Sequence, residues 1–189
     1  MNPAVATGLL CTALLTGCSG AITVDVALDT PACPSEPALV SRSLVLLAQS
    51  VPTSGWLPCI RSLPVGWTFT RLDAHDGGAT FALNSDREGN EATTVVLGPA
   101  CSVVGATEIP SEQPGTKRYE RVDRVSNGYA GERSYTYDGG CITYRFNLSG
   151  RAKAEPIAAV TEALGFVSRD MVRQYVRDRF GGQLELDPS

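Results

Sequence analysis

Residues 134–146 constrain the fold most, because they predict a β-hairpin with a defined register. The pair Asp138-Gly139 stands between two runs rich in aromatic and β-branched residues and favours a two-residue type I′ turn. Such a turn places Tyr135 opposite Ile142, and alternation along each strand then fixes which side chains share a face. The face expected to point into the core carries Tyr135, Tyr137, Ile142, Tyr144 and Phe146.

Strand patterns extend over much of the chain before this hairpin. Residues 67–73 and 80–84 flank the turn sequence His75-Asp76-Gly77-Gly78 and predict a second hairpin. Residues 93–97 are rich in β-branched side chains, residues 101–104 follow the Gly98-Pro99 break, and residues 119–125 alternate in charge. We expect three further strands there, the last of them exposed or at an edge.

Helical patterns stand at both ends of this strand-rich region. A helix over residues 35–50 is predicted, with Ser35 as its cap and Pro52 as its stop. Another helix opens at Pro156 and ends at Gly165, and a last one begins after Ser168. Helices around a run of strands favour an α+β fold with a mainly antiparallel sheet, one N-terminal helix and two C-terminal helices.

The first residues predict export. Residues 1–17 carry no charged side chain and are too short to cross a membrane as a helix. They end in Leu15-Thr16-Gly17-Cys18, which resembles the lipobox of bacterial lipoproteins. The resemblance implies a cleaved signal peptide (1–17), a lipid anchor and tether (18–32) with acyl chains such as palmitate on Cys18, and one globular domain (33–189). The competing interpretation is a buried helix or uncleaved anchor with an incidental cysteine.

Four cysteines remain for the exported domain, and none belongs to a C-x-x-C pair. An even number in an oxidising compartment predicts two disulfides, with three possible pairings. We expect Cys33–Cys59, which would tie together both ends of a helix–loop unit. We also expect Cys101–Cys141, which would join residues 101–104 to the returning strand of the 134–146 hairpin.

Motifs for catalysis or cofactors are scarce. The net charge is −4 without a basic patch, so we expect no nucleic-acid partner. His75 is the only histidine and stands in a turn sequence, so we expect no catalytic or metal role for it. Residues 86–91 are acidic but lack calcium-loop spacing, which favours a solvated loop and no metal. No cofactor is expected. Three arginines recur every four residues in the last helix and predict a solvated basic ridge: Arg169, Arg173 and Arg177. The competing interpretation is contact with anionic lipid head groups or an acidic partner.

Two functions remain open. The first is a non-catalytic binding or interaction module of the cell envelope, lipid-anchored on the extracytoplasmic face of the membrane, with an envelope protein or wall polymer as partner. The second is a carboxylate-dependent hydrolase that acts on cell-wall material, because paired carboxylates are set by space and leave no sequence motif. We expect the first. Two facing carboxylates in a pocket would favour the hydrolase, and a shallow apolar groove rimmed by tyrosines would favour binding.

Overall fold

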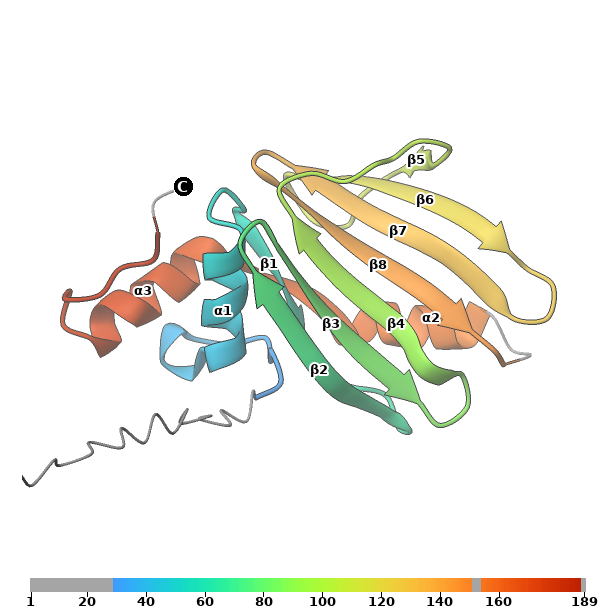
Figure 1. Ribbon diagram of the computed structural model, residues 1–189, viewed down its shortest axis with the longest axis horizontal. Helices are drawn as coiled ribbons and strands as arrows, with labels where there is room; N and C mark the ends of the chain where they lie inside the picture. Colours follow the sequence, from blue (N-terminus) through green and yellow to red (C-terminus); the bar gives the residue numbers. More distant parts are fainter. Residues whose placement is uncertain (1–28, 151–153, 188–189) are drawn as a thin grey trace, which may run out of the picture.

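The computed structural model describes residues 29–150 and 154–187. Within them a seven-stranded antiparallel sheet has the strand order β2-β3-β4-β8-β7-β6-β5 (Figure 1). Its strands are β2 (Trp67–His75), β3 (Gly78–Ser85), β4 (Gly89–Gly98), β5 (Thr107–Ile109), β6 (Lys117–Arg124), β7 (Tyr129–Tyr137) and β8 (Gly140–Leu148). The predicted α+β class with a mainly antiparallel sheet is confirmed.

The remaining elements gather on one side of this sheet, which we call the inner face. They are η1 (Pro37–Leu39), α1 (Arg42–Ser50), β1 (Trp56–Ile60), α2 (Ala154–Ala163), β9 (Leu164–Ser168) and α3 (Arg169–Arg179). β1 and β9 pair as a two-stranded ribbon that packs on β4 and β8, and α1 packs on β2 and β3. α2 lies behind the sheet and α3 packs against α1 (Figure 1).

The core lies between the inner face and this second layer. Phe81 and Leu83 of β3 and Val95 and Leu97 of β4 are at most 1% exposed. Tyr135, Ile142, Tyr144 and Phe146 are also buried, and Tyr137 packs against the core at its margin. The core face predicted from the 134–146 hairpin is therefore confirmed.

The register of that hairpin is the predicted one, but its turn differs. Tyr135 pairs with Ile142, as predicted. Gly139 has a φ of 76°, whereas Asp138 has no positive φ, so the turn is not type I′. The turn packs against the chain after α1, where the hydroxyl of Thr53 donates to the Gly139 carbonyl (2.7 Å) and a Cβ on Gly139 would collide with the Thr53 carbonyl. This long-range contact selects the turn geometry.

Two predicted elements are wrong in their bounds or existence. Ser35 does not cap a helix. α1 begins after Ser41, whose hydroxyl accepts from the Leu44 amide (3.3 Å), because the chain extends at Val40 after a single 3-10 turn. Residues 101–104 form no strand. Both edges of β4 are already paired, with β3 and β8, so a strand directly after β4 cannot pair with it, and the next strand of the chain is the short β5.

A third prediction is wrong at the end of α2. Leu164 and Gly165 do not complete a helix but begin β9, in which Gly165 pairs with Cys59 of β1. The strand is an apolar run of five residues, and its partner lies about a hundred positions earlier in the chain. Ser168 caps α3 as predicted, since its hydroxyl accepts from the Met171 amide (3.3 Å).

Both predicted disulfides are present. Cys33 and Cys59 are bonded with their Cα atoms 4.9 Å apart, and Cys101 and Cys141 with theirs 5.8 Å apart. Contacts of the domain begin before Cys33, because Ala32 forms a β-bridge to Ile60. No helix within residues 29–150 and 154–187 is long and apolar enough to cross a membrane.

Candidate functional site

The inner face changes character toward β6, where charged side chains replace the apolar core. The register of β6 and β7 sets Arg118 beside Tyr135 and Glu120 beside Arg133. Glu112 joins them from the connection between β5 and β6. We call these five residues the inner-face cluster: Glu112, Arg118, Glu120, Arg133 and Tyr135.

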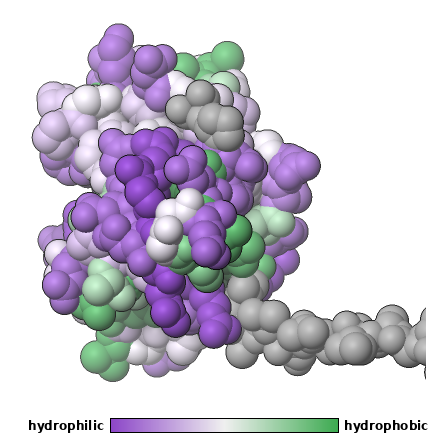
Figure 2. Space-filling view, turned by 90° about the vertical axis from the view of Figure 1, so that its left-hand side faces the viewer, coloured by the Kyte–Doolittle hydropathy of each residue, from purple (hydrophilic) through white to green (hydrophobic). Residues whose placement is uncertain are grey.

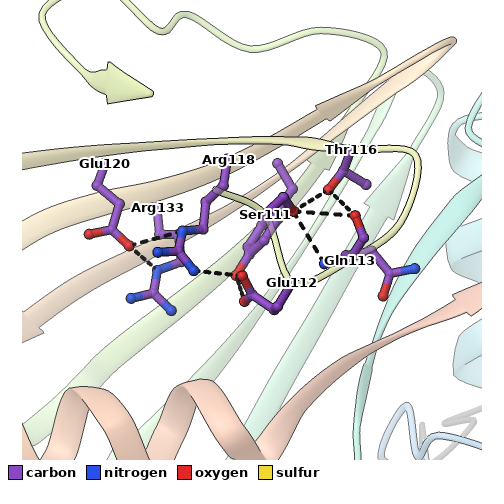
Figure 3. Close-up of polar contacts among 8 residues, drawn as sticks. Ser111, Glu112, Gln113, Thr116, Arg118, Glu120 and Arg133 are labelled. Carbon is purple, nitrogen blue, oxygen red and sulfur yellow. Dashed lines mark hydrogen bonds and ion pairs between the residues drawn. The ribbon is translucent and has the colours of Figure 1, made fainter. Parts of the chain in front are cut away.

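The charges of the inner-face cluster alternate along a chain of ion pairs. A terminal nitrogen of Arg118 lies 2.6 Å from a Glu112 oxygen, and its Nε lies 3.4 Å from Glu120 Oε1. Arg133 Nε lies 2.7 Å from the same Glu120 oxygen. Figure 3 shows the two guanidinium groups between the carboxylates of Glu112 and Glu120. The cluster therefore neutralises itself.

Tyr135 links the cluster to the core. Its ring is buried, and its hydroxyl donates to Glu112 Oε1 (2.6 Å). Burial raises the pKa of Tyr135, and the hydrogen bond to Glu112 raises it further. Burial also acts to raise the pKa of Glu112, but the hydrogen bond from Tyr135 and the charge of Arg118 outweigh it, so this pKa lies below its usual 4.5. Glu112 is thus an ionised acceptor and Tyr135 a neutral donor.

The loop that carries Glu112 is held by its own hydrogen bonds. The hydroxyls of Ser111 and Thr116 lie 2.6 Å apart, and the Thr116 hydroxyl donates to the Gln113 carbonyl (2.9 Å) (Figure 3). The Ser111 hydroxyl also accepts from the Gln113 amide (3.2 Å). Ser and Thr hydroxyls favour such turns by bonding to neighbouring backbone groups. Glu112 therefore lies in a locally hydrogen-bonded loop, one residue before the Gln113–Thr116 turn.

A groove of about 330 Å³ adjoins the cluster, between α2 and strands β6 to β8. Its apolar wall includes Tyr129 and Phe146, whose ring centroids lie 6.3 Å apart, and Ile157 of α2. Glu120 and Arg133 of the cluster line its polar side. We call this the α2 groove. It is an apolar trough with a tyrosine at its rim and a charged pair at its edge.

A second pocket is acidic and smaller, about 150 Å³. Asp86, Glu88 and Glu155 line it together with Trp67. Glu88 is buried, and its carboxylate accepts from the Gly150 amide (2.7 Å), so the loop over residues 86–91 is not solvated throughout as expected. The described residues contain no group of three or more His, Cys, Asp or Glu side chains arranged to hold a metal ion.

His75 lies apart from both sites. It is exposed at the end of β2, and its Nδ1 lies 3.1 Å from the Asp76 carbonyl oxygen. It adjoins a shallow surface pocket with Gln49 and Asp187, away from the residues of the α2 groove. The four cysteines of the domain are all in disulfides, and Cys18 lies outside the described residues.

The predicted basic ridge on the last helix is wrong, because its first member is buried. Arg169 donates to the carbonyls of Ala48 and Asp187, so it ties α3 to α1 and to the C-terminal segment. Burial lowers the pKa of Arg169, and the charge of Arg173 lowers it further. Arg173 is half-buried, and only Arg177 of the three is exposed. The end of the molecule that carries α3 is mainly hydrophilic, with small and separate hydrophobic areas (Figure 2).

The sequence pointed to the strand of the cluster but missed its partners. The alternating charges of residues 119–125 indicated an exposed strand, and β6 does carry them. Which of these charges meet Arg133 and Tyr135 depends on the register of β6 on β7. Glu112 comes from the loop between β5 and β6, whose residue types predict only a loop and no contact with Tyr135. The run Ser111 to Thr116 could have signalled a closed turn.

Comparison with known proteins gives no relative. No family model, curated protein or solved structure matches this chain.

Proposed function

We propose that the protein is a lipid-anchored module of the bacterial envelope that binds an apolar group in the α2 groove without chemical turnover. The groove supports the binding role, because it combines Tyr129, Phe146 and Ile157 on one side with a charged pair on the other. Ligand sites are typically mainly apolar, with a few placed polar groups. The resemblance of residues Leu15 to Cys18 to a lipobox supports the proposed location at the membrane.

The pairing of the charges supports a non-catalytic role. A general base or nucleophile needs a group that is poised to give or take a proton. At the groove, Arg133 is engaged with Glu120, and Arg118 with Glu112. Glu132, which also lines the groove, is paired with Arg121 (3.0 Å) and Arg145 (2.9 Å). Tyr129 has its pKa raised by burial and by Glu120, which keeps it neutral. The groove therefore offers contacts and no poised acid–base pair.

The anchor is tested by metabolic labelling with a palmitate analogue. We expect label on the wild-type protein and none on Cys18→Ser, because the proposed acylation begins at the sulfur of Cys18. Two or more acyl chains on that sulfur and the new amino terminus would give stable anchoring. Equal label on both proteins would contradict the lipoprotein assignment.

Binding is tested with the neutral fluorophore N-phenylnaphthylamine, whose emission rises in apolar sites. Ala158 is exposed and lines the α2 groove, so Ala158→Trp fills the groove without disturbing the core. Ala159, the next residue of the same helix, lines the acidic pocket and supplies the matched control Ala159→Trp. We expect at least tenfold weaker binding for Ala158→Trp only. His75→Ala should bind as the wild type does, and no binding by the wild type would contradict the proposal.

The acidic pocket supports one alternative, a carboxylate-dependent hydrolase acting on wall material. Glu88 is buried there beside Asp86 and Glu155, and hydrolases of this class use a pair of carboxyl groups that flank the scissile bond. Release of soluble sugar from purified cell wall, lost in Glu88→Gln and retained in Ala158→Trp, would establish this alternative. No release by the wild-type protein would remove it.

A further inference from the structure

We infer that the inner-face cluster is a carboxylate-binding site, and that Glu112 occupies it in place of a ligand. The site would take the head group of an amphipathic monocarboxylate whose apolar part lies in the α2 groove. This inference rests on the proposed binding function and names the ligand class of that groove.

The two side chains that donate to Glu112, Tyr135 and Arg118, are held in fixed positions on the sheet. Tyr135 is 1% exposed and is held in the hydrogen-bonded register of β7 with β6 and β8. Its ring packs edge-on against Phe166 of β9, with centroids 4.9 Å apart. The side chain of Arg118 is 18% exposed and lies on the neighbouring strand. A hydroxyl and a guanidinium fixed side by side form a ready receptor for one carboxylate.

Glu112 has the opposite character. Its side chain is 53% exposed, and it stands on a turn that closes through Ser111, Gln113 and Thr116. The turn's own hydrogen bonds do not depend on the contact of Glu112 with Tyr135, so the carboxylate can leave without unfolding a strand. A movable acceptor on rigid donors is the arrangement expected for an internal stand-in for a ligand.

The charge balance fits a single negative charge. With Glu112 in place, the guanidinium groups of Arg118 and Arg133 are matched by the carboxylates of Glu112 and Glu120. Without Glu112, two positive charges face Glu120 alone, and a net charge of about +1 remains. One ligand carboxylate restores neutrality, whereas a cation or a ligand with two carboxylates would not.

The cluster and the groove share residues, which sets the position of the ligand's apolar part. Glu120 and Arg133 line the α2 groove and also belong to the ion-pair chain that ends at Glu112. A chain that leaves the carboxylate position therefore passes these two residues and reaches the apolar wall with Phe146 and Ile157. Burial of that chain supplies the hydrophobic part of the affinity.

A probe pair separates head group from chain: a dansyl-labelled fatty carboxylate and the same chain ending in a neutral amide. We expect Glu112→Gln to bind the carboxylate about five- to tenfold more tightly than the wild type, because the internal competitor has lost its charge. The amide should bind both proteins equally. Glu108 supplies the matched control, since it accepts from Tyr119 (3.1 Å) on the outer face of the sheet, and Glu108→Gln should change neither affinity.

Glu112→Ser removes the same carboxylate with a shorter side chain and should reproduce the gain. Equal carboxylate affinity in wild type, Glu112→Gln and Glu112→Ser, with N-phenylnaphthylamine still bound in the groove, would overturn this inference and leave the proposed function standing. An equal gain for the amide would also overturn it, because a loosened turn would then explain both. Loss of groove binding in the wild type would instead contradict the proposed function.

Discussion

The two ends of the seven-stranded sheet use the same inner face for different purposes. Toward β2, the side chains of Phe81 and Leu83 are fully buried beneath α1 and the β1–β9 ribbon. Toward β6, the positions in register with Phe81 and Leu83 across the sheet carry Glu120 and the exposed Val122, and no helix of the described residues covers β5 (Figure 1). Burial of apolar area dominates folding stability, whereas exposed ion pairs contribute little. One end therefore holds the fold together, and the other is free to be specified for recognition.

The largest expected difference between the ends is the effect of truncation. Phe81→Ala should lower the free energy of unfolding by about 3 to 5 kcal/mol, because it empties a fully buried position. Val122→Ala, at a side chain 57% exposed in β6, should change it by less than about 0.5 kcal/mol. Urea unfolding followed by tryptophan fluorescence measures both. Similar losses in the free energy of unfolding would contradict the comparison, because both ends would then contribute equally to stability.

The two disulfides sharpen the comparison. Their cysteines are separated by 26 and 40 positions, and chain entropy gives each bridge about 3 to 4 kcal/mol. The pair Cys33→Ala and Cys59→Ala should cost somewhat more than the pair Cys101→Ala and Cys141→Ala, because Cys59 lies in the main core cluster. Thermal unfolding of the two double variants gives the order. A larger loss at Cys101–Cys141 would place the critical crosslink on the outer face.

Arg169 tests whether a buried charge also holds the apolar end. Arg169→Met keeps the volume but leaves the carbonyls of Ala48 and Asp187 without their donor, and should cost about 2 to 3 kcal/mol. Arg177→Met, an exposed arginine on the same helix, is the control and should be nearly neutral. Equal melting temperatures for wild type and Arg169→Met would show that these two hydrogen bonds add nothing.

The smallest expected effect is the pH dependence of the charged end. The pKa of Glu112 is lowered in the folded protein, so its contribution is present above about pH 4.5 and is lost as the pH falls through the folded value. Between about pH 6 and pH 3 the wild type should lose more stability than Glu112→Gln, by less than about 1 kcal/mol because this carboxylate is half exposed. Urea titrations at both pH values measure it, and parallel losses would contradict it.

Local patterns predicted the fold where strand partners are neighbours in sequence. The register of β7 with β8 followed from a two-residue turn, and Ser168 was recognisable as a cap because it stands directly before a helical pattern with Asp170 in its first turn. The β1–β9 ribbon was missed because its register depends on packing between distant segments. Residues 164–168 form a short, mainly apolar run, and such a run is equally compatible with the end of a helix and with a strand.

The candidate site was less predictable for the same physical reason. Alternating charge revealed an exposed strand at β6, but which charges meet is decided by its neighbours. Arg169 looked like a solvated residue because its helical spacing matches Arg173 and Arg177, and only the packing of α3 on α1 turns it inward. Periodicity describes one element at a time, whereas ion pairs and buried polar groups join several.

The Cys33–Cys59 bridge also determines how the domain would bear a mechanical load. A pull on the amino-terminal end enters at Cys33 and passes through the sulfur atoms directly into β1, in the middle of the domain. The hydrogen bonds from Cys33 to Ile60 and from Ile60 to Pro31, both 2.8 Å, share that load beside the covalent link. α1 lies inside the bridged loop, and the first residues of α1 meet the chain ahead of the bridge through hydrogen bonds from the Ser43 hydroxyl and the Arg42 amide to Asp29. The end of the chain therefore cannot be peeled from the ribbon while the bridge is intact.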